Sequence, residues 1–326
     1  MKILLLGAYR FLGRAVIDAA LRGGHAVTAF NRGNHPAPAA VESIAGDRRD
    51  PSALAGRTWD AVIDTSGQVP DQVAASARML ADAAHYTFVS SLSVYRDPLA
   101  PFADESAPLA EMPAGVDAQD ATHVETYGAR KALCEAAAEA ALPGRVLHVR
   151  AGFIVGPHDV SDRFLSWFDR ARPGTPLVVP GDPHAPLQMI DVADLAAWMV
   201  TCAERGITGP YNATGPRTPF AFIDVAQAVV DATGSHARLV GMPAADAVAA
   251  GLEPWTEIAY WNEPADYAIM QSKVDRAFDA GLRMRPLRET AERIAAWGAT
   301  ATHARRIALD PAKEARAVAR FEAANA

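Results

Sequence analysis

The chain has 326 residues, which is enough for one large α/β domain or for two lobes that share a cleft. Half of its residues are hydrophobic and 21% are charged, and no apolar run is long enough to cross a bilayer. The formal net charge of −7 argues against broad nucleic-acid binding, because phosphates are neutralised by a concentrated basic face. We therefore expect neither a membrane nor a nucleic-acid partner.

Two features of the sequence indicate a reducing, cytoplasmic location. The apolar start Lys2–Leu6 is soon interrupted by Arg10 and Arg14 and lacks the layout of a signal peptide, so we interpret it as a buried strand. Cys134 and Cys202 lie far apart inside helical patterns and cannot form a disulfide framework. We therefore expect a cytoplasmic protein.

Strand and helix patterns alternate through the first half of the chain. Short apolar runs are typical of strands buried on both faces of a parallel sheet, and the segments between them show helical spacing. This order predicts a Rossmann-type, doubly wound parallel sheet, with its ligand beyond the carboxyl ends of the strands. The predicted strands are Lys2–Leu6, Ala26–Phe30, Val41–Ala45, Ala61–Asp64, Thr87–Ser90 and Val146–Val149, and the predicted helices are Phe11–Leu21, Gln72–Ala84 and Val124–Ala141.

After about Arg150 the alternation loosens, and proline and glycine become frequent. Helices are predicted over Val192–Cys202, with Asp191 as a plausible N-cap, and over Ile223–Ala232. A last helix is predicted to begin at Asp310-Pro311, because an N-cap followed by proline is typical of a first turn. We expect a smaller C-terminal substrate-binding lobe, interleaved with the sheet. The predicted nucleotide-binding domain covers residues 1–155 with returning segments near 187–215, and the predicted lobe covers roughly 156–186 and 216–326.

The segment between the first predicted strand and helix has the features of a dinucleotide loop. Gly7 permits a tight turn, and Gly13 lets the helix pack closely on the strand while its N-terminus faces a pyrophosphate. The alternative is an ordinary turn, because any strand-to-helix connection attracts glycine. The dinucleotide interpretation makes cofactor contacts of Gly7, Arg10, Phe11, Leu12 and Gly13.

The end of the second predicted strand indicates which dinucleotide is bound. An acidic residue there would bind the ribose hydroxyls of NAD, but this chain reads Asn31-Arg32-Gly33. Arg32 can offer a bidentate fork to the 2′-phosphate of NADP, although a surface arginine is more often simply solvated. We therefore expect Asn31 and Arg32 at the ribose, with NADP(H) preferred and NAD(H) still open.

A tyrosine and a lysine four residues apart lie in the predicted helix over Val124–Ala141. The spacing of Tyr127 and Lys131 places both on one helix face, where the ammonium would lower the pKa of the phenol. Such a tyrosine can act as a general acid or base on a carbinol or carbonyl oxygen. The pair alone is also compatible with a solvated helix face.

Three stretches resemble the extended and atypical short-chain dehydrogenases/reductases of the NAD(P)-dependent epimerase/dehydratase family. The first is the glycine-framed loop with Arg14-Ala15-Val16, in which Arg10 stands where the usual pattern has a third glycine. The others are Val89-Ser90-Ser91-Leu92-Ser93-Val94-Tyr95 and Tyr127-Gly128-Ala129-Arg130-Lys131. The resemblance spans nearly the whole chain and is specific as far as about Asn212.

The resemblance implies a catalytic set of Ser91, Tyr127 and Lys131. The family's strand-end motif places the catalytic serine four residues before a tyrosine, which selects Ser91 as the group that stabilises charge on the substrate oxygen. The resemblance also implies that Lys131 holds the nicotinamide ribose and that Arg10 meets the extra phosphate of NADP. Further implied cofactor contacts are Asp47 at the adenine, unless it is an ordinary turn aspartate, and Thr65, Ser66 and Gly67 along the cofactor.

Three functions are compatible with these residues. The first is an NADP(H)-dependent oxidoreductase that transfers a hydride between nicotinamide and a carbonyl or secondary alcohol of a small-molecule substrate. The second is a sugar-nucleotide epimerase that retains its nucleotide; dehydration is less favoured, because Leu92 and Ser93 stand where a dehydratase has an acid. The third is a dinucleotide-sensing or RNA-binding relative without chemistry.

The sequence leaves the substrate and the oligomeric state open. Five aromatic residues could line a pocket but are more often core, and the histidines do not have metal-ligand spacing, so we expect no metal. Members of this family often form homodimers through paired helices, although no pattern here identifies that face. The aromatic residues are Phe164, Trp167, Trp255, Tyr260 and Trp261, and the histidines are His123, His148 and His158.

Overall fold

The computed structural model describes residues 1–34 and 37–326 and divides into two compact units. The first unit holds the predicted nucleotide-binding elements, together with a short segment, 272–283, that the sequence pattern did not single out. The first unit consists of Met1–Phe153, Val192–Thr214 and Ser272–Arg283, and the second of Ile154–Asp191, Gly215–Gln271 and Met284–Ala326.

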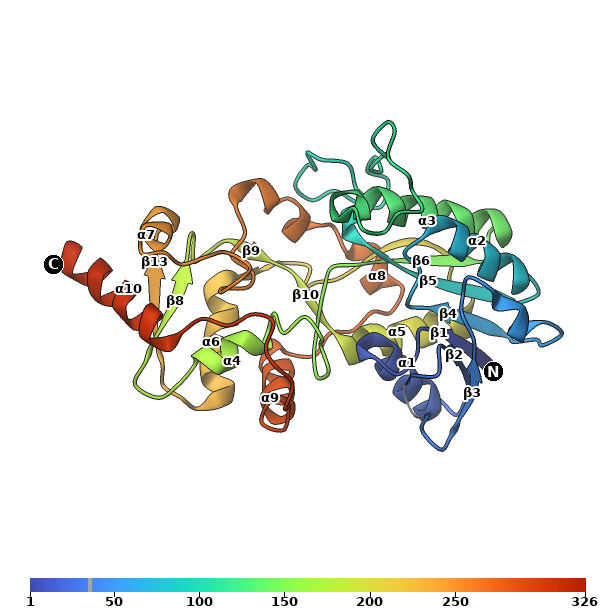
Figure 1. Cartoon of the computed structure of the whole chain (residues 1–326), viewed down its shortest axis with the longest axis horizontal. Coiled ribbons are helices and arrows are strands. Elements are labelled where there is room, and N and C mark those ends of the chain that lie inside the picture. The colour runs from blue at the N-terminus through green and yellow to red at the C-terminus, as the bar shows by residue number, and fades with distance from the viewer. Residues whose placement is uncertain (35–36) are drawn as a thin grey trace. The chain divides into compact units, whose positions relative to one another are not determined.

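A seven-stranded sheet forms the centre of the first unit (Figure 1). Its strand order is β11-β6-β5-β4-β1-β2-β3, and every neighbouring pair is parallel. The predicted Rossmann-type fold is therefore confirmed. The strands are β1 (Lys2–Leu6), β2 (Ala26–Asn31), β3 (Val41–Ala45), β4 (Ala61–Asp64), β5 (His85–Ser91), β6 (Val146–Ala151) and β11 (Gly209–Ala213).

Helices cover both faces of this sheet, as the apolar strands require. The helices α2 (Pro70–Met79) and α3 (Tyr127–Ala141) pack together on one face, and α1 (Phe11–Arg22) and α5 (Val192–Arg205) pack together on the other (Figure 1). The short helix α8 (Asp275–Asp279) contacts β11. The core between the sheet and the α2–α3 layer includes Leu4, Leu6, Val62, Phe88, Cys134 and Ala138.

Most predicted elements agree with the structure to within a few residues: the helix predicted over Val124–Ala141 begins at Tyr127, after the 3-10 turn Val124–Thr126. The end of another helix is further from its prediction. The apolar spacing predicted a helix over Gln72–Ala84, whereas α2 ends at Met79. Leu80 and Ala83 still pack in the core, although they lie in turns. The backbone N–H of Ala84 already bonds the carbonyl of Asp60, because the chain must turn there to enter β5. The core contacts continue past the helix, and the periodicity therefore overestimated its length.

The order of strands in the sheet reverses beside β1. The chain runs outward from β1 to β2 and β3, and then crosses back to place β4 on the other side of β1. The loops that follow β1 and β4 therefore lie side by side at the carboxyl edge of the sheet. A doubly wound sheet binds its ligand at such a reversal.

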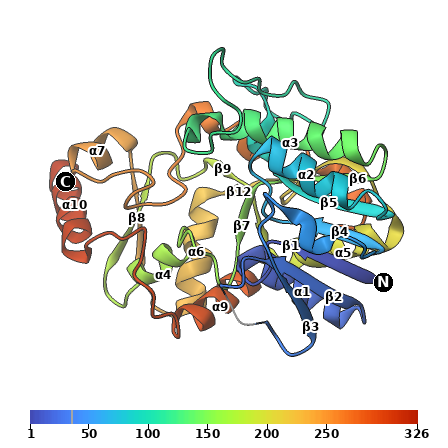
Figure 2. The same ribbon diagram turned by 45° about the vertical axis from the view of Figure 1, so that its right-hand side comes forward.

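The second unit contains short strands and helices. Strand β8 (Pro176–Pro180) pairs with β13 (Arg238–Met242) in parallel, and β9 (Pro186–Leu187) pairs with β12 (Phe220–Ala221). Helices α4 (Leu165–Arg170), α6 (Phe222–Thr233) and α9 (Leu287–Gly298) pack on one another (Figure 2). This unit also contains α7 (Ala244–Ala249), α10 (Pro311–Ala324), β10 (Met189–Asp191) and the 3-10 turns η4 (Pro264–Asp266) and η5 (Ile269–Gln271). Strand β7 (Phe153–Val155) begins in the first unit and continues into the second, and the 3-10 turns η1 (Pro51–Leu54), η2 (Leu92–Val94) and η3 (Val124–Thr126) belong to the first.

Several sequence expectations about single residues are settled here. Asp310 caps α10 as predicted, because its carboxylate accepts a hydrogen bond from the Ala312 N–H at 2.9 Å. Cys134 and Cys202 are both buried and free. No helix in the described part of the chain is long and apolar enough to cross a membrane. The aromatic residues of the second unit include four that are almost completely buried, as core residues are: Phe164, Trp167, Tyr260 and Trp261.

A buried ion pair attaches α10 to the rest of the second unit. Glu314 accepts hydrogen bonds from Arg170 at 3.2 and 2.5 Å and from the Val178 N–H at 2.8 Å. Its side chain is only 4% exposed. Removing one member of a buried pair leaves the other charge without compensation.

We predict that Glu314→Ala lowers the free energy of unfolding by about 3 kcal/mol, because Arg170 and the Val178 N–H lose their acceptor. The matched control is Glu322→Ala, also on α10, which breaks an exposed pair with Arg238 on β13. That change should cost less than about 1 kcal/mol. Thermal and urea denaturation of the two variants measures both values. Equal losses in the two variants would contradict the assignment of Glu314 as the buried anchor.

Candidate active site

The loop after β1 has the tight backbone of a nucleotide-binding turn. The φ angles of Gly7, Tyr9 and Phe11 are 88°, 71° and 24°, so the left-handed region recurs at alternate positions. A Cβ at Gly13 would lie 2.2 Å from the carbonyl oxygen of Gly7, so only glycine allows this approach of helix to loop. Non-glycine residues with positive φ carry backbone strain, which is concentrated at binding sites.

The N-terminus of α1 lies in this loop with its backbone donors available. Arg10 is the N-cap residue, yet its side chain does not cap the helix, and the first turn contains no acidic residue. The phenol oxygen of Tyr9 is buried and has no hydrogen-bond partner among the described residues. Uncapped N–H groups and the helix dipole favour an anion. The loop therefore fits the pyrophosphate of a dinucleotide.

The residues predicted at the ribose and adenine lie after β2 and β3. Arg32 is exposed, while the Asn31 side chain accepts a hydrogen bond from the Gly33 N–H at 2.8 Å. The Asn31 Nδ2 is buried and unpartnered among the described residues. Asp47 binds Arg49 through both carboxylate oxygens, which lowers the pKa of Asp47 to about 2. The Arg32 charge contributes to that lowering, so the two loop ends are electrostatically coupled.

The loop after β4 touches the nucleotide loop directly. The Thr65 hydroxyl donates to the Gly7 carbonyl at 2.9 Å and to the Leu6 carbonyl at 3.2 Å. Ser66 is exposed, and Gly67 is buried. The reversal of strand order beside β1 thus brings Thr65, Ser66 and Gly67 against the predicted pyrophosphate loop.

The turn that carries Ser91 packs on the first turn of α3. The Ser91 hydroxyl donates to the Ser93 hydroxyl and accepts from the Ser93 N–H, both at 3.1 Å. A Cβ at Gly128 would lie 1.9 Å from the Ser93 carbonyl oxygen, so glycine is required for this contact. Tyr127 is the first residue of α3 and is half-buried. The turn that carries Ser91 therefore packs on the helix turn that begins at Tyr127, and the catalytic roles of both residues stay predictions.

The Lys131 side chain extends from α3 to strand β5 and to the loop after β4. Its ammonium donates to the carbonyls of Gly67 and Val89, both at 2.6 Å, and lies 4.2 Å from the centroid of the Phe88 ring. Burial lowers the pKa of Lys131 to about 8. Lys131 thereby connects the helix of Tyr127 with the loop after β4 and with the strand that leads to Ser91.

A second buried network holds α3 in place, and the sequence did not reveal it. Arg150 on β6 forms a bidentate pair with Glu135 on α3 at 2.8 and 3.1 Å, and donates to the Tyr95 phenol at 3.1 Å. The Tyr95 phenol in turn donates to Asn212 at 2.5 Å. Glu135 lies one helical turn after Lys131, so this pair fixes α3 against β6.

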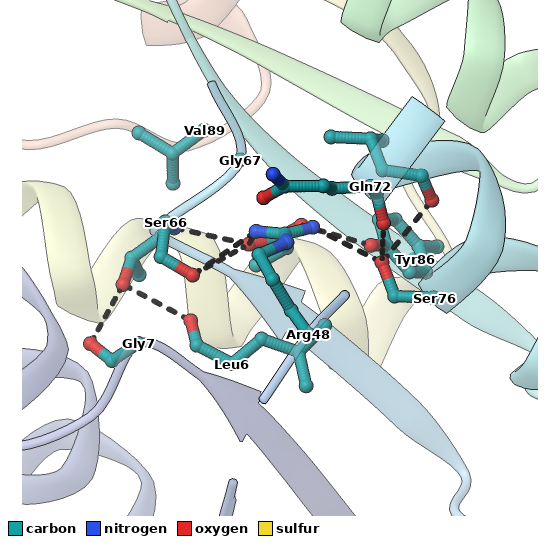
Figure 3. A network of polar contacts seen from close by, with 12 residues as sticks. Leu6, Gly7, Arg48, Ser66, Gly67, Gln72, Ser76, Tyr86 and Val89 are labelled. Atoms are coloured by element: carbon teal, nitrogen blue, oxygen red, sulfur yellow. Dashed lines mark hydrogen bonds and ion pairs between the residues drawn. The ribbon is translucent and has the colours of Figure 1, made fainter. Parts of the chain in front are cut away.

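A third network lies beneath the loop after β4 (Figure 3). Arg48 donates to both carboxylate oxygens of Asp64, to Ser66 and to Ser76. The Tyr86 phenol donates to Asp64 at 3.0 Å. The sequence carried one signal of this network that we did not use, namely a carboxylate at the end of an otherwise apolar strand.

Comparison with known proteins agrees with this geometry. The model of the NAD dependent epimerase/dehydratase family matches residues 3–213. A curated relative is the chloroplast stem-loop binding protein of 41 kDa b from Arabidopsis thaliana, 25% identical over 218 residues, which are 60% of this chain and 53% of that protein. This chain therefore spans about half the length of that relative.

Solved structures of similar fold include epimerases. The UDP-Glc/GlcNAc 4-epimerase of Campylobacter jejuni superposes with a TM-score of 0.68 at 14% identity, covering 92% of this chain and 99% of that one. The Bordetella bronchiseptica enzyme WbmH with NAD+ gives 0.65 at 17% identity, covering 91% and 97%. A human epimerase family protein with NADPH gives 0.63 at 18% identity, covering 91% and 99%. At these identities the likeness establishes the fold, and the match over residues 3–213 establishes that the chain belongs to the NAD dependent epimerase/dehydratase family.

Proposed function

We propose that this chain is an NADP(H)-dependent oxidoreductase that interconverts a carbonyl and a secondary alcohol, with Tyr127 as general acid and base. The observation that carries the proposal is the buried ammonium of Lys131, one turn after Tyr127, on a helix whose first turn packs on the turn of Ser91. The family membership and the two free cysteines are compatible with such an enzyme in a reducing cytoplasm.

Each member of the proposed catalytic set has a distinct task. A bound nicotinamide dinucleotide would supply or accept the hydride. Tyr127 would donate a proton from its phenol oxygen to the substrate oxygen during reduction and take it back during oxidation. The Lys131 ammonium, one helical turn after Tyr127 on α3, would stabilise negative charge on the phenol oxygen and would hold the ribose of the cofactor. Ser91 would donate a hydrogen bond to the substrate oxygen as charge develops on it.

The preference for NADP(H) rests on two arginines, Arg10 in the loop after β1 and Arg32 after β2, which would bind the extra phosphate. The end of β2 reads Asn31-Arg32-Gly33, without the acidic residue that NAD-specific enzymes place there, and both Arg10 and Arg32 are exposed. The similar structures with NAD+ and NADPH support a nicotinamide dinucleotide as the cofactor, and the arginines favour the phosphorylated form.

A sugar-nucleotide epimerase is the second candidate, favoured by the epimerases of similar fold. An epimerase returns the hydride to the same substrate and has no need to exchange its nucleotide. Mass spectrometry of the nucleotide released from freshly purified, denatured protein separates the two. An empty site that binds NADPH far better than NADH supports the reductase, whereas stoichiometric bound NAD would favour epimerisation.

We predict that Arg32→Ala raises the dissociation constant of NADPH by about ten- to a hundredfold and leaves that of NADH unchanged, because a charge-assisted bond to the phosphate is lost. Arg22→Ala is the matched control, since this exposed arginine lies in the last turn of α1, away from the loop. Fluorescence titration with each nucleotide measures both constants. Equal weakening of NADPH and NADH by Arg32→Ala would remove the basis for NADP preference.

We predict that Tyr127→Phe lowers turnover by at least about a hundredfold, because general acid–base catalysis is lost. Carbonyl compounds that stimulate NADPH oxidation by the wild-type protein provide the substrate. NADPH affinity should change less than about threefold, because the proposed role of the phenol is proton transfer and binding is left to other groups. Retained turnover in Tyr127→Phe would exclude this residue as the general acid.

The Arabidopsis relative is a stem-loop binding protein, which makes RNA binding without hydride transfer a third candidate. The formal net charge of −7 argues against it. We predict no saturable binding of a stem-loop RNA at 0.15 M salt by gel shift, while NADPH binds to the same preparation. Tight RNA binding together with no hydride transfer would replace the proposed function.

A further inference from the structure

The guanidinium of Arg48 lies next to the loop after β4, where the cofactor is proposed to bind (Figure 3). Its two terminal nitrogens bond separate oxygens of Asp64 at 3.0 and 2.8 Å, and continue to the hydroxyls of Ser66 at 3.1 Å and Ser76 at 3.0 Å. One side chain therefore connects four segments, which are the loop after β3, the end of β4, the loop after β4 and helix α2.

The carboxylate that accepts from Arg48 is fully buried. Asp64 is 0% exposed, and it also accepts hydrogen bonds from the Ser66 N–H and the Tyr86 phenol, both at 3.0 Å. An apolar pair of similar volume would stabilise a core at least as well, because two charges must be desolvated to bury an ion pair. The stability of the fold therefore does not explain why a charged pair lies at the edge where the strand order reverses.

The loop that this pair holds has two other contacts. The Thr65 hydroxyl bonds the carbonyl of Gly7 in the nucleotide loop at 2.9 Å. The Gly67 carbonyl accepts the Lys131 ammonium at 2.6 Å. Ser66, between them, is bonded through its backbone to Asp64 and through its hydroxyl to Arg48. The loop Thr65–Gly67 thus contacts the Arg48–Asp64 pair, the nucleotide loop and the proposed catalytic lysine, and a displacement of the pair would displace the loop's contacts to the other two.

Arg48 and Asp64 have opposite effects on the pKa of Lys131. Two groups outside its helix act on the ammonium, Asp64 raising its pKa and Arg48 lowering it, while Cys134 and Glu135 on α3 raise it. Burial has the largest effect and brings the pKa of Lys131 to about 8. With Arg48 and Asp64 both present, their opposite charges offset each other.

We propose that Arg48 is a positioning residue, which clamps Asp64 so that the loop Thr65–Gly67 supports both the nucleotide loop and the ammonium of Lys131. The inference rests on the proposed function, in which the dinucleotide lies along these loops and Lys131 holds its ribose. Arg48 is not a catalytic residue here, because it acts through Asp64 and Ser66.

The first test is NADPH binding, which needs no substrate. Arg48→Met should raise the dissociation constant of NADPH at least about tenfold, while Arg48→Lys keeps the charge and restores part of the affinity. Arg57→Met is the matched control, because this exposed arginine pairs with Glu42 on β3 and should leave affinity unchanged. Melting temperatures show whether each variant is folded before its affinity is compared.

The second test is the pH dependence of NADPH affinity between pH 7 and 10. Affinity should fall as Lys131 loses its proton, and Lys131→Met should abolish that fall. Arg48→Met leaves Asp64 unopposed and should move the fall to higher pH by about one unit, while Asp64→Asn should move it lower. In the double variant Arg48→Met/Asp64→Asn, the pH at which NADPH affinity falls should return toward the wild-type value.

A purely structural role would lower the melting temperature of Arg48→Met without moving either readout, and that result would overturn the proposal. The proposal would also be overturned if Arg48→Met and Asp64→Asn moved the pH at which NADPH affinity falls in the same direction. Failure of the proposed function has a different signature. In that case the wild-type protein does not bind NADPH, or Lys131→Met binds it with unchanged affinity and pH dependence.

Discussion

The hydrogen bonds from the Lys131 ammonium to the carbonyls of Gly67 and Val89 determine how the candidate site is assembled. A buried ammonium requires hydrogen-bond acceptors, and the loop after β4 and the neighbouring strand β5 supply them. Because Lys131 lies on α3, the same bonds fix the helix that begins at Tyr127. The reversal of strand order beside β1 then adds the nucleotide loop, since the loop after β4 has Gly7 as its neighbour. One buried cation thus connects α3, strand β5 that leads to Ser91, and the loop after β4 that contacts Gly7.

The carboxylates near that cation are each paired with an arginine, so they stabilise the ammonium less than unpaired carboxylates would. Asp64 pairs with Arg48 and Glu135 pairs with Arg150, so each carboxylate close to Lys131 has its own guanidinium. If either carboxylate lacked its partner, its charge would favour the ammonium more strongly and raise the pKa of Lys131. With both pairs intact, desolvation is the dominant effect on Lys131. The main effect of the two ion pairs is therefore on the charge environment of Lys131, because buried ion pairs contribute little net stability.

The sequence was sufficient to predict the sheet and the list of candidate residues, because these follow from local patterns. Continuous apolar runs identified the strands, and the spacing of Tyr127 and Lys131 placed both on one helix face. The networks around Arg48 and Arg150 could not be predicted in this way. Their partners are separated by 16 and 15 residues or more, so only the strand order brings them together. For the same reason the end of α2 was misplaced, since Leu80 and Ala83 are apolar for packing reasons after the helix has ended.

The substitution of arginine for the middle glycine of the nucleotide loop has a simple backbone explanation. Arg10 has φ −119° and ψ 146°, an extended conformation that every residue adopts readily. The left-handed conformations fall instead on Gly7, Tyr9 and Phe11, which flank it on alternate positions. The middle position of this loop therefore does not require glycine. Tyr9 and Phe11 instead have the strained backbone conformations, which cost about 1–3 kcal/mol each. Such strain persists only where surrounding contacts hold the backbone, and here those contacts come from Gly13 and from Thr65. The loop can thus present a cation at the start of α1, next to backbone N–H groups that already favour an anion.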